Sequence, residues 1–183
     1  MNIVVVAGTN RTGSRTRSIA GAIMNRYAGI AGVTVQLLDL ATLPLDLLSP
    51  EAYGTKPAAF APFAEAVLAS DGLHIVTPEY NGGMPGALKL FIDHLPFPES
   101  FERRPVCFTG VAAGRWGALR PIEQLQGVFG YRNAYQLPDR VFISGATKAL
   151  GEDGWPVEPH VSTLLAAQVT HFVQFCEAVK PLR

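Results

Sequence analysis

The chain has 183 residues, of which 48% are hydrophobic and 16% charged, and this length and composition predict one folded domain over residues 1–183. Fifteen basic and fifteen acidic residues cancel, which excludes a strongly charged surface and predicts no nucleic-acid or membrane partner. The sequence shows no run of roughly 18 apolar residues, no secretory leader and no CxxC spacing, so we expect a cytoplasmic protein.

Strand and helix patterns alternate along the chain. Apolar runs and one alternating segment predict five strands, at Ile3–Ala7, Val33–Leu40, Leu73–Thr77, Val106–Val111 and Arg140–Ser144. Helical patterns begin at about Arg15, run from Pro57 to about Ala69, end at His94 and fill the C-terminal segment. Such alternation predicts an α/β fold with a doubly wound parallel sheet. Ligands of these sheets lie beyond the carboxyl ends of the strands, so the loops after the first, third and fourth strands are candidate sites.

The loop after the first strand reads AGTNRTGSRTRS, from Ala7 to Ser18. It precedes a predicted helix whose unpaired N–H groups favour an anion. Its hydroxyl, amide and guanidinium groups belong to Thr9, Asn10, Arg11, Thr12, Ser14, Arg15 and Thr16. The simpler alternative is an N-capping loop in which Ser14 and Thr16 satisfy only the backbone. Because one cap is enough for that role, we interpret the loop as a phosphate site.

The loop matches neither of the common nucleotide motifs. Gly8 and Gly13 have the spacing of a nucleoside-triphosphate loop, but Ser14 stands where that motif has its lysine. Asn10 replaces the second glycine of the dinucleotide fingerprint, and Asp39 follows Gly8 by about thirty residues instead of about twenty. A phosphate monoester therefore fits better than a pyrophosphate. We expect Asp39 to cap its strand end or to pair with a surface base.

The loop after the third strand reads TPEYNGG and suits a flat ring. Pro78 fixes its direction and removes a donor. Asn81-Gly82 is a strong turn dipeptide, and its glycine also lets a ring approach the backbone. Tyr80 is expected to lie against such a ring. Glu79 has no histidine or second acid in this segment, so we expect a helix-end or subunit-contact role for it rather than general-base catalysis.

The loop after the fourth strand reads TGVAAGRWGAL, from Thr109 to Leu119. Gly110, Gly114 and Gly117 permit close backbone approach, and Trp116 either walls a pocket or packs under a subunit contact. One phosphate-type loop and two ring-type loops at the same sheet edge describe a mononucleotide site. Flavin mononucleotide (FMN) at the switch point of a five-stranded flavodoxin-like sheet satisfies all three.

Two motifs resemble those of a known family. GTNRTGSRT is similar to the phosphate loop GTxRxxSxx of the NADPH-dependent FMN reductase family, and PEYNGGMPGALKLFIDHL is similar to its signature PEYNxxxPGxLKNxIDWx. The family includes chromate, quinone and azo-dye reductases. The resemblance spans nearly the whole chain and implies cofactor-binding roles for Thr9, Arg11, Ser14, Thr16, Pro78, Glu79, Tyr80, Asn81, Gly82, Gly114 and Gly117.

The sequence departs from the family pattern at three positions. Arg15 stands where a small polar residue is common, and we include it among the predicted cofactor-binding residues because it adds charge to the phosphate loop. Leu90 replaces an asparagine and His94 replaces a tryptophan. These two follow the flavin loop, so they affect the expected subunit contact and substrate pocket more than the cofactor.

The resemblance implies a flavodoxin-like sheet of strand order 2-1-3-4-5 with helices on both faces. It implies FMN and NADPH as cofactors and no catalytic side chain, because the flavin carries the chemistry. Electrons would pass from NAD(P)H through FMN to a small-molecule acceptor such as free flavin, a quinone, an azo compound or a metal oxyanion. A homodimer or homotetramer is expected through the helix from Gly86 to His94, whose apolar residues exceed what one sheet face covers. Lys89 and Asp93 would pair within this helix or across the two-fold axis.

Two other functions stay open at this point. A flavodoxin-type electron carrier would bind FMN without oxidising NAD(P)H itself, but such carriers dock through acidic faces and this chain is neutral. A subunit kept for assembly, with an unused flavin site, is disfavoured by the intact first and second loops. NAD(P)H oxidation and flavin binding separate the three. We expect structural roles for His74, His160 and His171, and buried inert thiols at Cys107 and Cys176.

Overall fold

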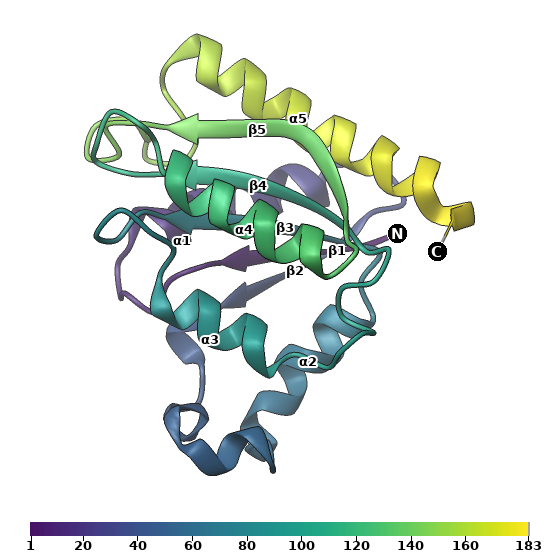
Figure 1. Ribbon diagram of the computed structural model, residues 1–183. Coiled ribbons are helices and arrows are strands. Elements are labelled where there is room, and N and C mark those ends of the chain that lie inside the picture. Colours follow the sequence, from purple (N-terminus) through teal and green to yellow (C-terminus); the bar gives the residue numbers. More distant parts are fainter. Residues whose placement is uncertain (183) are drawn as a thin grey trace.

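The computed structural model describes residues 1–182 and shows a central sheet between layers of helices (Figure 1). The strands are β1 (Asn2–Ala7), β2 (Thr34–Asp39), β3 (Gly72–Pro78), β4 (Pro105–Val111) and β5 (Tyr135–Ile143). The α-helices are α1 (Arg15–Ala28), α2 (Ala61–Leu68), α3 (Gly86–His94), α4 (Leu119–Tyr131) and α5 (Pro159–Val179). Short 3₁₀ turns are η1 (Leu40–Thr42), η2 (Leu45–Leu48), η3 (Pro50–Tyr53), η4 (Ala58–Phe60) and η5 (Lys180–Leu182). Within residues 1–182 no helix is both long and apolar enough to cross a membrane.

The strands form one parallel sheet of order β2-β1-β3-β4-β5, which confirms the predicted fold class. β1 lies between β2 and β3, and its last residue, Ala7, is opposite Asp39 on one side and Val76 on the other. The connections run in opposite directions on the two sides of β1. The carboxyl ends of β1 and β3 therefore define the switch point, where ligands of such sheets bind.

Alternate residues of β1 enter different layers of the core, because side chains of a strand point to opposite faces of its sheet. Ile3 and Val5 pack in the cluster that contains residues of α1 and α5. Val4 and Val6 pack in the cluster that contains residues of α2, α3 and α4. β3 and β4 are buried along their whole length, which explains why their apolar runs predicted them well.

The edge strand and two helices differ from the prediction. β5 begins at Tyr135, five residues before the predicted start, because an edge strand is partly exposed and carries polar residues and Pro138 that hide its pattern. The helix predicted from Pro57 divides into η4 and α2. α4 had no predicted bounds, since Pro121 and internal glycines interrupt its apolar periodicity.

Helix α3 has less spare apolar surface than the sequence predicted. Leu88, Phe91, Ile92 and Leu95 are each at most 6% exposed within the chain itself, so that expectation was wrong. They pack against β1, β3, β4 and the helices of the same layer. On the outer face of α3, Lys89 Nζ lies 2.7 Å from the Asp93 carboxylate, so these two residues pair within the helix.

A buried hydrogen-bond network links the sheet to α1 and α5. His74 Nδ1 lies 2.9 Å from the Tyr27 hydroxyl, and His74 Nε2 lies 2.8 Å from the Thr109 hydroxyl. Thr109 donates to Gln168 Oε1 at 2.6 Å, and the Gln168 amide donates to two backbone carbonyls. Burial lowers the pKa of His74 to about 3, so its ring is neutral at physiological pH. These contacts support the structural role expected for His74.

Both cysteines lie in the same layer of the core. Cys107 and Cys176 are 0% and 1% exposed, and neither forms a disulfide. Burial raises the pKa of the Cys107 thiol well above its ordinary value. A protonated, inaccessible thiol is a poor nucleophile, as the sequence predicted.

Candidate functional site

Three loops meet at the carboxyl edge of the sheet and border a cavity of about 380 Å³. They are the loops that follow β1, β3 and β4, joined by the segment after β5. The lining residues are Arg11, Gly13, Ser14, Arg15, Thr16, Pro78, Glu79, Tyr80, Val111, Ala112, Ala113, Ala146 and Thr147. The structure thus brings together the predicted residues Arg11, Ser14, Arg15, Thr16, Pro78, Glu79 and Tyr80.

The first loop turns the N-terminus of α1 toward this cavity. Ser14 is the N-cap of the helix, and its Oγ accepts a hydrogen bond from the Arg17 N–H at 3.1 Å. The capping alternative is therefore correct for Ser14, which still lines the cavity. The first turn of α1 has no acidic residue, so the positive end of the helix is not compensated. Thr16 is only 2% exposed, and its hydroxyl has no hydrogen-bond partner among residues 1–182.

Two arginines add positive charge to the same wall. Within the described chain the Arg11 guanidinium forms no ion pair, and Arg15 makes only a long contact of 3.5 Å to the Thr147 carbonyl. Gly13 has φ +66° and nothing within 4 Å of its β-carbon position. An unpaired hydroxyl, two guanidinium groups and a helix N-terminus are suited to a phosphate ester. These residues fit the phosphate end of FMN.

Thr9 and Tyr80 connect the first loop to the second. Their hydroxyl oxygens lie 2.7 Å apart, and Thr9 Oγ1 also accepts a hydrogen bond from the Arg11 N–H at 3.2 Å. Thr9 is 1% exposed and lies behind the cavity wall rather than in it. Its hydroxyl therefore fixes the position of Tyr80, which does line the cavity. The sequence predicted both residues but not the bond between them.

Asn81 and Gly82 form the tip of a tight hairpin. The Tyr80 and Gly83 backbones exchange two hydrogen bonds of 3.0 Å, and φ is +51° at Asn81 and +79° at Gly82. Two consecutive positive φ values are the mark of a type I′ turn, which strongly favours Asn-Gly. The nearest atom to a β-carbon at Gly82 is Arg120 Cδ, at 3.9 Å. Gly82 is thus required by the backbone conformation, and neither tip residue lines the cavity.

Glu79 holds the second loop to α4. Its carboxylate lies 3.0 Å from the Arg120 guanidinium, and the Glu79 side chain is only 15% exposed. Nearby, the Met84 N–H donates to Gln124 Oε1 at 2.8 Å. A carboxylate that is ion-paired in this way is poorly suited to general-base catalysis. Of the two expected roles, helix end or subunit contact, these contacts agree with the first, since Arg120 lies in the first turn of α4.

The glycines of the third loop serve packing. A β-carbon at Gly117, where φ is +55°, would lie 2.8 Å from the Phe142 carbonyl carbon in β5. One at Gly110 would lie 2.3 Å from the Gly117 carbonyl oxygen. Gly117 therefore lets the loop approach β5 and does not line the cavity. Gly114 is exposed, with nothing within 4 Å of its β-carbon position.

Six lining residues were not among the predicted site residues, namely Gly13, Val111 and four that follow β4 and β5. Ala112 and Ala113 follow β4, and Ala146 and Thr147 follow β5. The segments are joined by backbone hydrogen bonds, from the Ala112 N–H to the Ile143 carbonyl at 2.9 Å and from the Ala146 N–H to the Ala112 carbonyl at 3.0 Å. Small residues have no chemical signature. Only their place at the end of a strand beside the switch point could have indicated them.

Comparison with known proteins places the chain among flavin enzymes. The model of the NADPH-dependent FMN reductase family matches residues 1–148. The NADPH azoreductase of Bacillus sp. (strain OY1-2) is 30% identical over 182 residues, covering 100% of this chain and 98% of that protein. The quinone reductase of Escherichia coli (strain K12) is 28% identical over 190 residues, with 98% and 97% covered.

Solved structures agree with the fold. The flavoenzyme NAD(P)H:(acceptor) oxidoreductase from Paracoccus denitrificans superposes with a TM-score of 0.81 at 22% identity, covering 97% of each chain. A flavodoxin from Pseudomonas aeruginosa superposes with a TM-score of 0.60 at 16% identity, covering 98% of this chain and 99% of its own. At such identities the likeness concerns the flavodoxin-like fold alone.

Proposed function

The chain belongs to the NADPH-dependent FMN reductase family, and from that premise we propose how its residues serve an NAD(P)H-dependent flavin oxidoreductase. Residues 1–183 form one FMN-binding domain that passes electrons from NAD(P)H to a small acceptor. When bound, FMN supplies the redox chemistry by taking up electrons from NAD(P)H and releasing them to the acceptor. The chain supplies binding, orientation and the exclusion of water.

The first loop and α1 hold the phosphate end of FMN. The Thr16 hydroxyl, the Arg11 and Arg15 guanidinium groups and the N-terminus of α1 converge on one end of the cavity. The single observation that carries this assignment is Thr16, a residue only 2% exposed that lines the cavity and whose hydroxyl has no hydrogen-bond partner within the described chain. The cavity gives this hydroxyl access to a ligand, and a phosphate oxygen would supply its partner.

The second and third loops hold the ring end. Pro78 and Tyr80 of the second loop and Ala112 and Ala113 of the third line the cavity. Ala112 and Ala113 leave room for a flat ring beside the backbone. The remaining predicted residues do not line the cavity but position the loops that do: they are Thr9, Asn81, Gly82 and Gly117. Gly114 is an open backbone position on the third loop.

The test of this function is FMN binding combined with turnover. We expect the protein to bind about one FMN per chain, to bind riboflavin much more weakly, and to oxidise NADPH when a quinone is supplied. Absorbance after gel filtration gives the flavin content, and the decay of NADPH absorbance gives the rate. A protein that binds FMN but does not oxidise NAD(P)H would be a carrier. Equal affinity for riboflavin and FMN would contradict the phosphate assignment.

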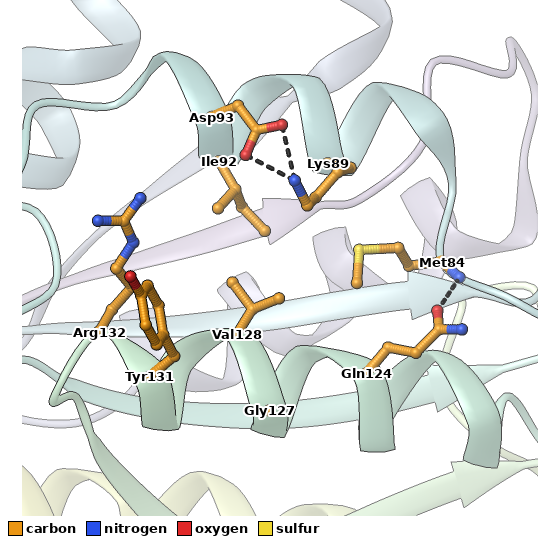
Figure 2. Close-up of a pocket in the computed structure, with 9 residues that line it drawn as sticks. All are labelled: Met84, Lys89, Ile92, Asp93, Gln124, Gly127, Val128, Tyr131 and Arg132. Carbon is orange, nitrogen blue, oxygen red and sulfur yellow. Dashed lines mark hydrogen bonds and ion pairs between the residues drawn. The ribbon is translucent and has the colours of Figure 1, made fainter.

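A homodimer, or a homotetramer built from it, is part of the proposal. A groove of about 550 Å³ runs between α3 and α4, with Met84, Ile92 and Val128 along its floor and Tyr131 at one end (Figure 2). Tyr131 is 81% exposed, and Phe97, beneath the Arg132 guanidinium at 4.2 Å, is 60% exposed. Exposed aromatic residues around an apolar groove are typical of a protein interface. A second copy of the chain is the expected occupant.

Light scattering tests the dimer. We expect a mass of at least twice the 19.6 kDa of one chain at micromolar concentration. The variant Tyr131→Asp should shift the protein toward the monomer, because a carboxylate in the contact would lose its hydration. Tyr53→Asp is the matched control, since Tyr53 is an equally bulky side chain, 62% exposed, on η3. A monomeric parent protein would refute the dimer.

The cellular setting is also proposed. We place the protein in the cytoplasm without nucleic-acid or membrane partners. The balance of fifteen basic and fifteen acidic residues and the buried cysteine thiols support this assignment. Cell fractionation tests it, and recovery of the protein in a membrane or periplasmic fraction would contradict it.

A further inference from the structure

The segment between the cavity and α4 carries an aromatic side chain that the proposed cofactor site does not use. Trp116 is 52% exposed, whereas Trp155, the other tryptophan, is 6% exposed. The Arg115 guanidinium lies over the Trp116 ring, 4.9 Å from its centroid. Trp116 does not line the cavity, but it follows the cavity-lining residue Ala113 by three positions on the same loop.

Backbone packing restrains this part of the loop. Gly117 is held against β5, where a β-carbon would lie 2.8 Å from the Phe142 backbone. The Leu119 N–H donates to the Trp116 carbonyl at 3.0 Å, and the Gly117 N–H donates to the Gly114 carbonyl at 3.3 Å. The indole is therefore presented to solvent from a restrained backbone. A restrained backbone keeps the indole in one position, where a flat ring could stack on it.

The charge around the cavity is positive. Arg11, Arg15, Arg115 and Lys148 form no ion pair with any of residues 1–182. The carboxylate that lines the cavity, Glu79, is already paired with Arg120 at 3.0 Å. An anion at the mouth of the cavity would meet unpaired cations and no unpaired cavity carboxylate. Such a field favours negatively charged ligands.

We propose that Arg115 and Trp116 form a subsite for a planar aromatic ring that carries an anionic group. The indole stacks on the ring, and the guanidinium pairs with the anion while remaining against the indole. This inference rests on the proposed function, because the subsite borders the cavity assigned to FMN. Two substrates of the enzyme have this chemistry: the adenosine 2′-phosphate portion of NADPH and an anionic aromatic acceptor.

Two pairs of probes distinguish the sources. Isothermal titration calorimetry on FMN-loaded protein measures Kd for adenosine 2′,5′-bisphosphate against adenosine 5′-phosphate. The same measurement compares anthraquinone-2-sulfonate with uncharged hydroxymethylanthraquinone. Within each pair the ring is the same, so the difference reports the anion. The variants are Trp116→Ala, Trp116→Phe, Arg115→Gln and Arg115→Lys.

We expect Trp116→Ala to raise Kd for both members of one pair about 5–10-fold, and Trp116→Phe to preserve most of the affinity. Arg115→Gln should raise Kd about 5–10-fold for the bisphosphate or the sulfonate alone, the member of each pair that carries the additional anionic group, with Arg115→Lys in between because it retains charge without the planar fork. Arg26→Gln is the matched control, since Arg26 lies over the Trp155 ring at 4.5 Å and its variant should leave both constants unchanged.

The outcomes distinguish the two substrates that could occupy the subsite. An effect confined to the bisphosphate assigns the subsite to NADPH, one confined to the sulfonate assigns it to the acceptor, and effects on both assign it to both. Unchanged constants in a protein that retains FMN and oxidises NADPH would overturn the subsite alone. Loss of FMN from the Arg115→Gln or Trp116→Ala protein would also overturn it. A parent protein that binds no FMN would overturn the proposed function instead.

Discussion

The interior network around His74 and the loop before α1 differ in whether their polar side chains have hydrogen-bond partners within the chain. In the interior, both ring nitrogens of His74 and the hydroxyl of Thr109 have hydrogen-bond partners. In the loop, Thr16 is also only 2% exposed, but it lines the cavity and its hydroxyl has no partner within the described chain. Folding supplies hydrogen-bond partners to the His74 network, whereas the Thr16 hydroxyl is left for a ligand to satisfy. Incomplete polar groups at a sheet edge therefore mark a binding site more clearly than polarity alone.

The largest expected effect comes from removing the centre of the complete network. His74→Ala leaves the Tyr27 and Thr109 hydroxyls without their histidine partner and creates a cavity. We expect a loss of about 3–5 kcal/mol in the free energy of unfolding, measured by urea denaturation. His160→Ala is the control, because His160 is exposed and should change stability by less than about 0.5 kcal/mol. A small loss in His74→Ala would show that the network contributes little.

Substitutions in the loop before α1 should change the affinity for FMN rather than the free energy of unfolding. Arg11→Ala removes a guanidinium that has no ion pair within residues 1–182, so folding should be almost unaffected. We expect FMN binding to weaken by roughly 1.5–3 kcal/mol, or about 10–100-fold in Kd, through loss of charge-assisted hydrogen bonding. Fluorescence titration with FMN and riboflavin measures this change.

The matched control for Arg11 is Arg17, which follows it by six positions. The Arg17 guanidinium is 2.9 Å from Asp39, so its partner is already present. Arg17→Ala should leave Kd for FMN within about 2-fold of the parent, and riboflavin should bind the parent and Arg11→Ala equally. If both arginine variants lose FMN to the same extent, the distinction between paired and unpaired groups is not what defines the site.

A change of pH tests the hydrogen-bond network around His74 in the unmutated protein. The folded pKa of His74 is about 3, below the ordinary value of about 6.5. Between these values the unfolded chain binds a proton that the folded chain excludes, so stability is lost as pH falls below 6.5. We expect a loss of about 2 kcal/mol from pH 6.5 to pH 5 for this one group, measured by urea denaturation. His74→Gln retains hydrogen-bonding groups without titrating in this range, and its stability should fall less steeply.

The sequence predicted the parts of the fold that one local pattern specifies. The run Ile3–Ala7 is buried on both faces and was recognised from its continuous apolar residues. β5 was placed too late because an edge strand alternates between exposed and buried positions and contains Pro138. The position of α4 depends on burial of Ile122, Leu125 and Phe129 against the sheet. Tertiary packing compensates there for glycines that local propensity disfavours.

The candidate site was predicted where its chemistry lies in side chains. Arg11 and Thr16 were identified from hydroxyl and guanidinium groups beside a helix start, and they line the cavity. Ala112 and Ala146 were not, because their contribution is to be small and to lie at strand ends. Gly82 was predicted both as part of a turn dipeptide and for the approach of a ring, and its φ of +79° supports the first reason. The motif identified the position of Gly82, and the structure shows which of the two reasons applies.

The smallest expected effect concerns a third region, where the interior itself leaves polar atoms incomplete. His94 is 1% exposed, and neither ring nitrogen has a hydrogen bond of standard geometry among residues 1–182, although the Leu47 backbone makes a weak polar contact with the ring. Its ring packs 4.6 Å from the Tyr53 ring and 6.2 Å from the Phe60 ring. Burial and the nearby Lys56 charge lower the pKa of His94, so the ring is neutral at pH 7. Its ring neighbours are aromatic, and one lysine lies nearby, whereas the loop before α1 has two arginines and a helix N-terminus.

An apolar ring of similar shape should therefore suit this position better than histidine. We expect His94→Phe to raise the free energy of unfolding by about 1 kcal/mol at pH 7, because it removes two buried polar atoms that lack hydrogen bonds of standard geometry. For a chain of this size the gain corresponds to roughly 2–4 °C in Tm. It should grow as pH falls below 6.5, since the folded parent excludes a proton that its unfolded chain binds. His160→Phe, at an exposed position, should show no gain. A loss of stability in His94→Phe would mean that the imidazole is hydrogen-bonded in solution, and Ser100 Oγ would then remain as a buried side-chain atom without a partner among residues 1–182.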